Sequence, residues 1–450
     1  TVLTDAKEYG SILNVESYNW DLLRRFVGGI DDEVQISLES AGVEETAEQL
    51  KQLVEQGEVM AQKYWVTVTN PPYAGMSKMN AKLNSFVQDN YADYKSDMFS
   101  AFVVKCSTMT RTNGYCAFLT PYVWMFIQSY EKMRNYLYAN TTIETLIQFE
   151  YSAFEEATVP ICTFAFRKGY IAKKGCYLRL TDFRGGMEVQ RQKTLEAINN
   201  HNCGYYFEQY SDNFAKIPGS PVAYWVSEKF TNMYKQTSIA QIATTREGMT
   251  TADNDQFVRL WEEVNSEHIA FGCTTSFEAQ KTNRRWFPYA KGGDFRKWYG
   301  NSWYVVDWQD DGWRIRNFKD EKTGRIRSHN YNLEYIFREC LSWTRVTSGN
   351  FCIRYYPKGY LCDTAGAGLF VEKDRMFLLG WLSTNIVNQM LQIQNPTIVV
   401  QAGDVARIPV PEKKNNKQDI ENLVEDNISI SKEDWDSFET SWDFKVHPLV

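Results

Sequence analysis

Hydrophobic residues recur with two different periods along the first 180 residues. A helical period predicts helices at 44–60, 96–111 and 122–138, and short apolar runs predict strands at 64–69, 115–120, 142–149, 158–167 and 176–182. Helices that alternate with strands are typical of a parallel sheet covered by helices. We therefore expect residues 1–182 to form an α/β fold, the carboxyl half of a doubly wound domain, with the last two strands as a closing hairpin.

The pattern changes after residue 182. Residues 183–204 are mostly polar and predict a connection. From 205 to 411, short aromatic-rich strands and turns replace the long helical periods, which is typical of an α+β domain. Pro409-Val410-Pro411 and the polar run 412–418 predict a linker, and residues 412–450 form an acidic region that begins a further C-terminal part.

The formal net charge of −7 hides an uneven distribution of charge along the chain. Residues 31–58 carry nine acidic side chains and one lysine, and residues 412–450 carry ten acidic and five basic side chains. Residues 281–327 carry twelve Lys or Arg and six Asp or Glu, with aromatic residues between them. This basic stretch is a candidate face for DNA, and a solvated surface loop is the other interpretation.

The number and spacing of the cysteines and histidines limit which metal sites the chain can form. The nine cysteines lie at least ten residues apart, which excludes paired C-x-x-C zinc sites, and only four histidines are present. No apolar run reaches the roughly 18 residues of a membrane span. We expect a reduced, cytoplasmic protein that has no membrane segment and binds no metal.

A rigid turn, Asn70-Pro71-Pro72-Tyr73, directly follows the strand at 64–69. The prolines fix the backbone and remove two N–H donors, so the Asn70 side chain and the Pro71 carbonyl are presented as acceptors. Two adjacent acceptors suit the two hydrogens of an exocyclic amino group, whose nitrogen lone pair would then point at an electrophile. Tyr73 offers a flat face on which a nucleobase can stack.

The turn resembles the catalytic motif of amino-methyltransferases that use S-adenosylmethionine, chiefly adenine-N6 DNA methyltransferases. The longer run 70–83 is similar to the PglX family, the large DNA methyltransferases of bacterial BREX phage-defence systems. Further blocks resemble the same family, at 217–225, 245–254, 286–300, 395–397 and 403–404. The resemblance therefore covers most of the chain.

This resemblance implies a catalytic domain at 1–182, a target-recognition domain at 205–411, and methyl transfer from S-adenosyl-L-methionine to an adenine of double-stranded DNA. Tyr73 and Phe154 would hold the two faces of an adenine that has been flipped out of the duplex. An ordinary core phenylalanine is the other interpretation of Phe154. The family also implies a role in phage defence, with other defence proteins as candidate partners.

Ten side chains are candidates for contact with DNA. Two follow the catalytic turn, and the others lie in three polar or basic segments of the second half, one of them beside Gly292-Gly293, where the backbone can approach a phosphate closely. Each could instead be a structural or solvated residue. They are Lys78, Lys82, Arg246, Thr251, Asn254, Lys291, Arg296, Lys297, Arg345 and Ser348.

The segment 363–370, Asp-Thr-Ala-Gly-Ala-Gly-Leu-Phe, imitates the Asp-x-x-x-Gly-x-Gly motif with which such enzymes bind their cofactor. No acidic residue ends a following strand to hold the ribose, so a turn of small residues is the preferred interpretation. The resemblance places the main cofactor motif before the catalytic loop, upstream of Thr1. The 450 residues alone are then expected to bind S-adenosylmethionine poorly.

Two other functions stay open. The chain could be the methyltransferase part of a fused restriction–modification enzyme whose nuclease lies outside these residues. It could also be a non-catalytic DNA-binding component of a defence system, in which the turn only reads an extruded base.

Overall fold

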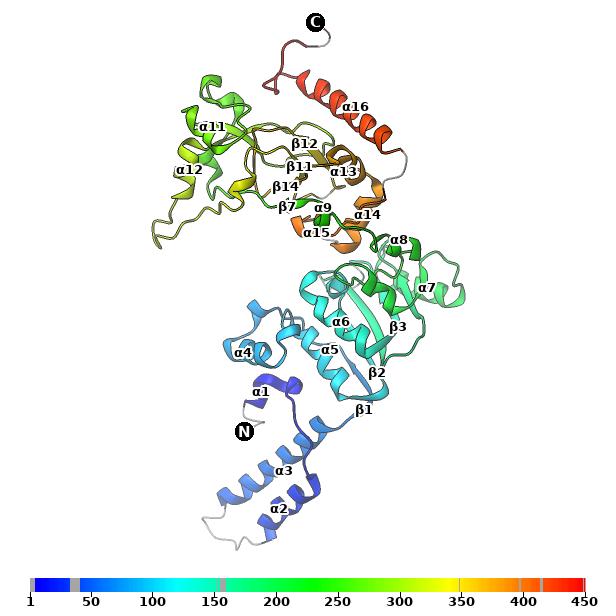
Figure 1. Ribbon diagram of the computed structural model, residues 1–450. Coiled ribbons are helices and arrows are strands. Elements are labelled where there is room, and N and C mark those ends of the chain that lie inside the picture. Colours follow the sequence, from blue (N-terminus) through cyan, green and yellow to red (C-terminus); the bar gives the residue numbers. More distant parts are fainter. Residues whose placement is uncertain are drawn as a thin grey trace. The chain divides into compact units, whose positions relative to one another are not determined.

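The computed structural model describes residues 5–32, 41–151, 153, 159–347, 349–395, 398–412, 416–447 and 449 (Figure 1). The chain divides into two compact units, Thr1–Val226 (unit 1) and Ser227–Val450 (unit 2). The boundaries expected at 182, 205 and 411 all lie inside these units.

Unit 1 is built on a six-stranded sheet with the order β1-β2-β4-β3-β5-β6. Strands β1, β2, β3 and β5 are parallel to one another, and β4 and β6 run in the opposite direction. Their bounds are Tyr64–Thr69, Thr110–Pro121, Thr141–Gln148, Ile161–Lys168, Gly175–Arg179 and Tyr206–Gln209 for β1 to β6. The five predicted strands are all present, in a mixed α/β arrangement.

The predicted closing hairpin is wrong, because β3 lies between β4 and β5. Strand β4 also pairs with β2, so both of its edges are covered. This central position allows Phe164 to stack on Phe118 of β2, with ring centroids 5.4 Å apart. Burial of such aromatic side chains stabilises a central strand more than an edge strand.

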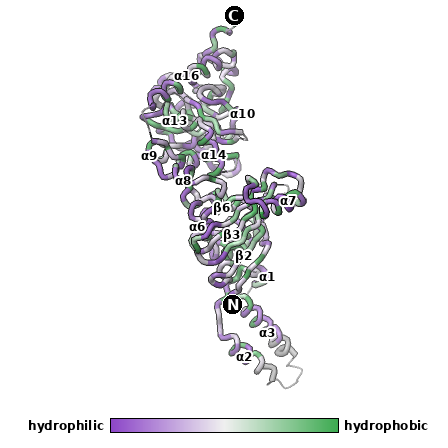
Figure 2. Tube along the Cα trace, turned by 90° about the vertical axis from the view of Figure 1, so that its right-hand side faces the viewer, coloured by the Kyte–Doolittle hydropathy of each residue, from purple (hydrophilic) through white to green (hydrophobic). Residues whose placement is uncertain are grey.

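Helices cover both faces of the sheet (Figures 1 and 2). α5 (Met98–Met109) and α6 (Glu131–Asn140) bury Val103 and Leu137 in one core with Phe118. α7 (Gly186–Asn199) buries Ala197 in a second core with Leu178, the neighbour of Tyr177 in β5. Since neighbouring side chains of a strand point to opposite faces, the two cores lie on opposite sides.

Two expectations for the helices of unit 1 are wrong, one of them only in part. Residues 183–204 contain a helix, α7, and its buried Gln190 accepts a hydrogen bond from the Glu150 N–H and donates one to the Phe183 carbonyl. The helix predicted at 122–138 is confirmed from Glu131 on, as part of α6, but residues before it form two short 3₁₀ turns, Tyr122–Met125 and Gln128–Tyr130. α7 can be buried at Gln190 because the polar groups there are hydrogen-bonded. It therefore lacks the apolar stripe from which a helix is predicted.

The remaining helices of unit 1 pack in two pairs. α2 (Trp20–Asp32) packs against α3 (Ala41–Ala61), and α3 confirms the helix predicted at 44–60. α1 (Ala6–Tyr9) packs against α4 (Ala81–Asn90) through stacked rings of Tyr9 and Phe86, 4.2 Å apart.

Unit 2 contains two four-stranded sheets, in the orders β13-β9-β10-β8 and β12-β11-β14-β7. The strands are β7 (Thr244–Arg246), β8 (Val258–Leu260), β9 (Trp286–Ala290), β10 (Tyr304–Asp307), β11 (Cys340–Thr344), β12 (Ile353–Tyr356), β13 (Leu361–Cys362) and β14 (Gly366–Phe370). The helices are α8 (Glu228–Met233), α9 (Ile239–Ile242), α10 (Asn254–Phe257), α11 (Ser276–Lys281), α12 (Gln309–Arg316), α13 (Arg375–Leu382), α14 (Asn385–Gln394), α15 (Ala402–Ala406) and α16 (Lys417–Asp436).

Residues 413–415 lie outside the described part of the chain. On both sides of them, the prediction of a linker is wrong. Val410 is buried, and its N–H donates to the Thr237 carbonyl at 2.7 Å. α16 packs against α13 and buries Val424 and Trp435. The carboxyl-terminal helix therefore belongs to the packed core of unit 2.

None of the helices in the described ranges is long and apolar enough to cross a membrane.

Candidate active site and nucleic-acid surface

The loops after the first three strands of unit 1 meet at one edge of the sheet. β1, β2 and β3 are parallel, so their carboxyl ends lie on the same side, which is where α/β sheets bind their ligands. The Tyr73 hydroxyl, after β1, donates to the carbonyl of Leu119 in β2 at 3.0 Å. The Tyr122 N–H, after β2, donates to the Pro160 carbonyl at 3.0 Å.

The turn 70–73 presents Asn70 to solvent on a rigid support. Pro71 is buried, while Asn70 and Pro72 are exposed. Tyr73 is half-buried and packs edge-on against Phe99 of α5, with ring centroids 6.4 Å apart. Burial, followed by the nearby Cys162, raises the pKa of Tyr73 to about 12, so its hydroxyl stays a donor at neutral pH.

The Tyr73 hydroxyl also donates to the Asn70 side-chain oxygen at 2.7 Å. An amide oxygen has two lone pairs, so this bond fixes the orientation of the amide and leaves one lone pair for another donor. The turn can therefore offer an oriented acceptor to an amino group, as the sequence predicts for Asn70.

Asp97 joins the loop after this turn to the start of α5, and sequence reasoning missed it. Its carboxylate accepts hydrogen bonds from the Ala74 N–H at 2.9 Å and from the Phe99 N–H at 3.2 Å. Burial raises the pKa of Asp97, and the hydrogen bonds from these N–H groups oppose that shift. An Asp immediately before an apolar helical run is a helix-cap signal, which predicts the cap but not the tertiary contact.

Aromatic residues other than the predicted pair also lie at this edge of the sheet. Tyr151, 56% exposed, follows β3, and Tyr122 follows β2. Burial, followed by charges on Cys162, Tyr151 and Glu150, raises the pKa of Tyr122. Phe154 lies outside the described residues. The position of a tyrosine just after a strand is the signal that could have found Tyr122 and Tyr151.

The two predicted DNA-contacting lysines that follow the turn 70–73, Lys78 and Lys82, differ in their surroundings. Lys78 is exposed in a 3₁₀ turn, Met76–Lys78, and its charge opposes the effect of burial, which raises the pKa of Asp97. Lys82 in α4 forms an exposed ion pair with Asp5, with an N–O distance of 3.2 Å. Exposed pairs contribute about 0–1 kcal/mol, so Lys82 can exchange this partner for a phosphate at little cost.

Three of the predicted residues in unit 2 lie on or after β7. The Arg246 guanidinium lies over the ring of Tyr335, 5.2 Å from its centroid. The Thr251 hydroxyl is buried and donates to the side-chain oxygen of exposed Asn254 at 2.9 Å. Asn254 is therefore accessible and is supported by Thr251, while Arg246 is half-buried.

The predicted set around Gly292-Gly293 makes contacts within unit 2. Lys291 is half-buried over the ring of Tyr304, and burial lowers its pKa. Arg296 pairs with Asp434 at 3.0 Å and lies over Trp435. Lys297 donates to the Ser383 carbonyl at 2.7 Å.

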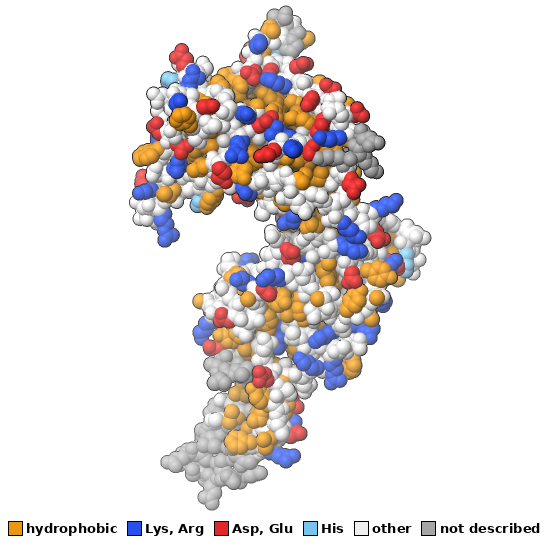
Figure 3. Space-filling view, in the orientation of Figure 1, with side chains coloured by type: hydrophobic (Ala, Val, Ile, Leu, Met, Phe, Trp, Pro, Cys, Tyr) orange, Lys and Arg blue, Asp and Glu red, His pale blue; other side chains and the backbone are white. Residues whose placement is uncertain are grey.

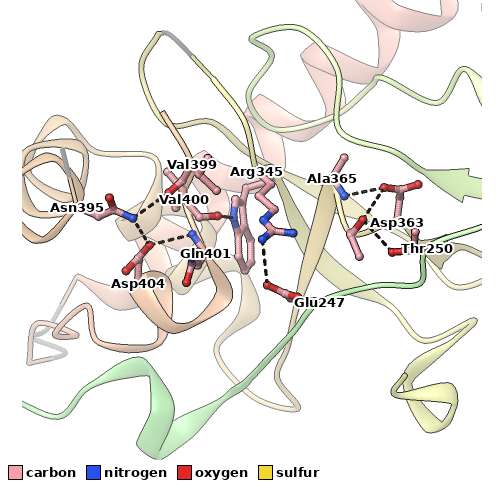
Figure 4. A network of polar contacts seen from close by, with 12 residues as sticks. Glu247, Thr250, Arg345, Asp363, Ala365, Asn395, Val399, Val400, Gln401 and Asp404 are labelled. Carbon is pink, nitrogen blue, oxygen red and sulfur yellow. Dashed lines mark hydrogen bonds and ion pairs between the residues drawn. The ribbon is translucent and has the colours of Figure 1, made fainter. Parts of the chain in front are cut away.

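Arg345 lies between two polar clusters, one around Asp363 and one around Asp404 (Figure 4). Its side chain pairs with Glu247 at a long 3.7 Å, and its carbonyl accepts from the Val400 N–H at 2.8 Å. Asp404 accepts from the Asn395 side chain at 2.8 Å. The motif residues Asn395 and Asp404 thus form a structural network. Ser348 lies outside the described residues.

The segment 363–370 begins directly after β13, forms a turn and continues into β14. The Asp363 carboxylate accepts from the Tyr289 hydroxyl and from the Ala365 N–H, both at 2.6 Å. A side chain at Gly366 would place its Cβ only 2.4 Å from the Ala290 carbonyl oxygen. Close packing of strands therefore explains these small residues, in line with the preferred interpretation of the sequence.

No group of three or more His, Cys, Asp or Glu side chains with the arrangement of a metal site occurs among the residues described.

Comparison with known proteins supports the sequence resemblance. Residues 17–154 match the Eco57I restriction-modification methylase family. The chain is 38% identical to the adenine-specific methyltransferase PglX of Lacticaseibacillus casei (strain Zhang), over 99% of this chain and 37% of that protein. The similarity to PglX extends along almost the whole of this chain. It is also 31% identical to the adenine-specific methyltransferase BrxX of Escherichia coli O9:H4 (strain HS), over 100% of this chain and 36% of that protein.

The chain spans little more than a third of the length of these relatives. Its fold is shared with the Type IIL restriction-modification enzyme MmeI, whose structure was solved in complex with DNA. That likeness has a TM-score of 0.52 and 12% sequence identity, and it covers 85% of this chain and 52% of that one.

Proposed function

We propose that this chain is the catalytic-loop and target-recognition part of a site-specific DNA methyltransferase that modifies the N6 amino group of adenine. The observation that carries the proposal is the turn 70–73. It presents Asn70, exposed and held by Tyr73, at the carboxyl edge of parallel strands. The 38% identity with an adenine-specific methyltransferase supports adenine as the base.

Asn70 would act on the nitrogen during the reaction. The amino group of adenine is a weak nucleophile because its lone pair is delocalised into the ring. Hydrogen bonds from its two hydrogens to the Asn70 side chain and the Pro71 carbonyl favour a pyramidal nitrogen with a localised lone pair. S-adenosylmethionine supplies the electrophilic methyl group when it is bound.

The adenine must leave the duplex to reach Asn70, because its amino group is otherwise buried in base pairing. Tyr73 would contact one face of the flipped base, and Phe154 the other. The half-buried Tyr73 ring is fixed by Phe99 and by two hydroxyl contacts, so it is an ordered stacking surface.

The described residues offer no cofactor loop in 363–370, since Asp363 and the glycines make structural contacts. We assign the main S-adenosylmethionine motif to sequence upstream of Thr1. Unit 2 would recognise the target sequence in double-stranded DNA. The relatives' names connect the protein with BREX phage defence, where methylation would mark host DNA, and other defence proteins would be partners.

A methylation assay on the full-length protein that contains this chain tests the proposal. Unmethylated duplex DNA, amplified in vitro from the host genome, is incubated with the protein and isotopically labelled S-adenosylmethionine and is then digested to nucleosides. N6-methyl-2′-deoxyadenosine is expected as the labelled product. Labelled N4-methyl-2′-deoxycytidine would refute adenine as the base, and specific DNA binding without any transfer would support the non-catalytic alternative.

A further inference from the structure

A short basic hairpin, residues 318–328, projects from unit 2 after α12 and carries unpaired cations (Figure 1). Backbone hydrogen bonds join its two sides, from Asp320 N–H to Arg325 O at 2.8 Å and from Arg327 N–H to Phe318 O at 2.9 Å. The Asp320 carboxylate accepts from the N–H groups of Lys322 and Thr323 at 3.1 and 2.8 Å. The tip is therefore a defined turn.

The base of the hairpin is anchored in the core of unit 2. The Phe318 ring packs edge-on against Phe257, with centroids 5.2 Å apart. The Ser328 hydroxyl donates to the Ile315 carbonyl at 2.6 Å. His329 exchanges two backbone hydrogen bonds with Thr250, which places the hairpin beside the segment that contains Thr251 and Asn254.

Four cationic side chains of the basic hairpin are exposed: Lys319, Lys322, Arg325 and Arg327. Within the described part of the chain none of them forms an ion pair, whereas Arg285 and Arg314 both pair with Asp307 and Arg316 pairs with Asp311. The acidic side chains in the hairpin are Asp320, whose carboxylate caps the turn, and exposed Glu321.

The cations occupy more than one side of the hairpin. Lys319 pairs directly with Ile326 across the ribbon, so these two side chains lie on one face. Arg325 and Arg327 flank Ile326 and therefore lie on the opposite face, where Arg327 covers the Phe318 ring at 5.2 Å. Lys322 is at the tip. Figure 3 shows basic side chains at the projecting end of this segment.

We propose that the basic hairpin inserts into the major groove of the target DNA, with cations on both faces directed at the two phosphate backbones. This inference rests on the proposed function and adds the surface that holds the duplex. The major groove admits a two-stranded β-ribbon, and a cation on each face matches a groove whose two walls are both phosphate chains. A-form RNA has a major groove too narrow for such a ribbon.

The test uses the full-length protein with Lys319, Lys322, Arg325 and Arg327 all replaced by Gln. The control removes the same charge from four other exposed lysines of unit 2, Lys229, Lys235, Lys373 and Lys445. Equilibrium binding to one duplex is measured from about 50 to 300 mM salt. Each lost phosphate contact lowers the slope of log affinity against log salt by about 0.9, so the hairpin variant should lose about 2–4 from that slope.

The hairpin variant should also bind at least about tenfold more weakly than the control at 100 mM salt, and it should keep its single-turnover rate of methyl transfer at saturating DNA. An unchanged slope, or an equal loss in the control, overturns the proposal. A loss confined to binding of structured RNA also overturns it. A single Lys322→Glu change at the exposed tip repeats the test if the fourfold variant does not fold.

This outcome is separable from failure of the proposed function. If the unaltered protein methylates adenine and the hairpin variant binds normally, only the hairpin assignment fails. If the unaltered protein binds the duplex through the hairpin but transfers no methyl group, only the catalytic assignment fails.

Discussion

Tyr73 contributes a hydroxyl as well as an aromatic ring to the turn 70–73. The hydroxyl has a single proton and two acceptors within reach, Asn70 at 2.7 Å and Leu119 at 3.0 Å. It therefore ties the Asn70 side chain, which we propose to face the adenine, to the end of β2. Its function as a positioning group differs from the stacking function that the sequence suggests for the ring.

Replacement of Tyr73 by Phe should separate these two functions. The ring remains, and the lost hydrogen bond, worth about 0.5–1.5 kcal/mol, should lower the single-turnover rate by about 3–10-fold. The matched control is Tyr115→Phe, on the exposed part of β2. Equal rates for the Tyr73 variant and the unaltered protein would show that the hydroxyl does not position Asn70.

The pH dependence adds a second readout for Tyr73. Burial raises its pKa to about 12 from an unperturbed value near 10, so the protonated donor is favoured in the folded protein and is lost only as the pH rises toward 12. The ratio of the rates of the unaltered protein and the Phe variant should stay constant from pH 7 to 9.5. A ratio that falls toward one within this range would contradict a buried Tyr73 donor.

At the residue scale, sequence reasoning finds what is contiguous. Asn70 to Tyr73 form one rigid tetrapeptide after a strand, and the structure places them at the end of β1. Asp97 acts on Ala74, 23 residues earlier in the chain, and such a contact has no local signal. Arg296 and Lys297 look like free cations in the sequence, but their partners Asp434 and Ser383 are distant in the chain.

At the scale of elements, β1 to β5 are predicted correctly because their apolar runs are continuous. The order of the strands is not predictable in the same way. The pairing of β4 with both β2 and β3 depends on tertiary packing of Phe164 and Phe118. Gly114 illustrates the same limit: it lies in a bulge of β2, where a Cβ would lie 2.7 Å from the Trp65 carbonyl oxygen.

Some of the positive charge of the basic stretch 281–327 is neutralised by ion pairs within the stretch itself. Asp307, at the end of β10, is 1% exposed and accepts from Arg285 at 3.0 Å and from Arg314 at 2.5 Å. These two arginines hold α12 and the segment before β9 on the same carboxylate. The count of basic residues in the sequence therefore overstates the charge available to DNA.

Replacement of Asp307 by Ala should lower the free energy of unfolding of unit 2 by about 2–3 kcal/mol, since hydrogen bonds to charged groups contribute about 1.5–3 kcal/mol. Chemical denaturation monitored by tryptophan fluorescence measures the change. Glu262→Ala removes an exposed carboxylate as the control. A change no larger than that of the control would show that the Asp307 contacts do not stabilise the unit.

At the scale of the whole molecule, the residues after 411 belong to unit 2. Trp435 of α16 is 5% exposed, and its ring contacts Trp303 with centroids 4.9 Å apart. The contact could not be predicted from the sequence, because the acidic composition and the polar run 412–418 are typical of a linker. The apolar positions of α16 are few, and their partners lie in α13 and around β10.

Replacement of Trp435 by Ala should destabilise unit 2 by about 3–5 kcal/mol, the usual cost of truncating a buried aromatic side chain. It should also increase cleavage by a protease between residues 411 and 417, because α16 loses its anchor. Phe438→Ala, at a 51% exposed position, is the control. An unfolding curve unchanged by the Trp435 substitution would mean that α16 does not pack on unit 2.

The isolated 450-residue chain should bind S-adenosylmethionine only at millimolar concentration, because the one run in it that imitates the cofactor motif, 363–370, is held in strand contacts. Calorimetry with the isolated chain measures this directly. Micromolar affinity that is lost in Asp363→Asn would return the cofactor assignment to this segment.

The most direct test of the central claim is single-turnover methyl transfer by the Asn70→Ala variant of the full-length protein, measured beside equilibrium binding to the same duplex. Loss of one preorganised hydrogen-bonding group costs on the order of 10²–10³ in rate, so transfer should fall by that factor while the dissociation constant changes by less than about threefold. Asn199→Ala, at an exposed position of α7, is the control. Near-normal transfer by the Asn70 variant would contradict the mechanism, and weakened binding with normal transfer at saturating DNA would make the turn a recognition element instead.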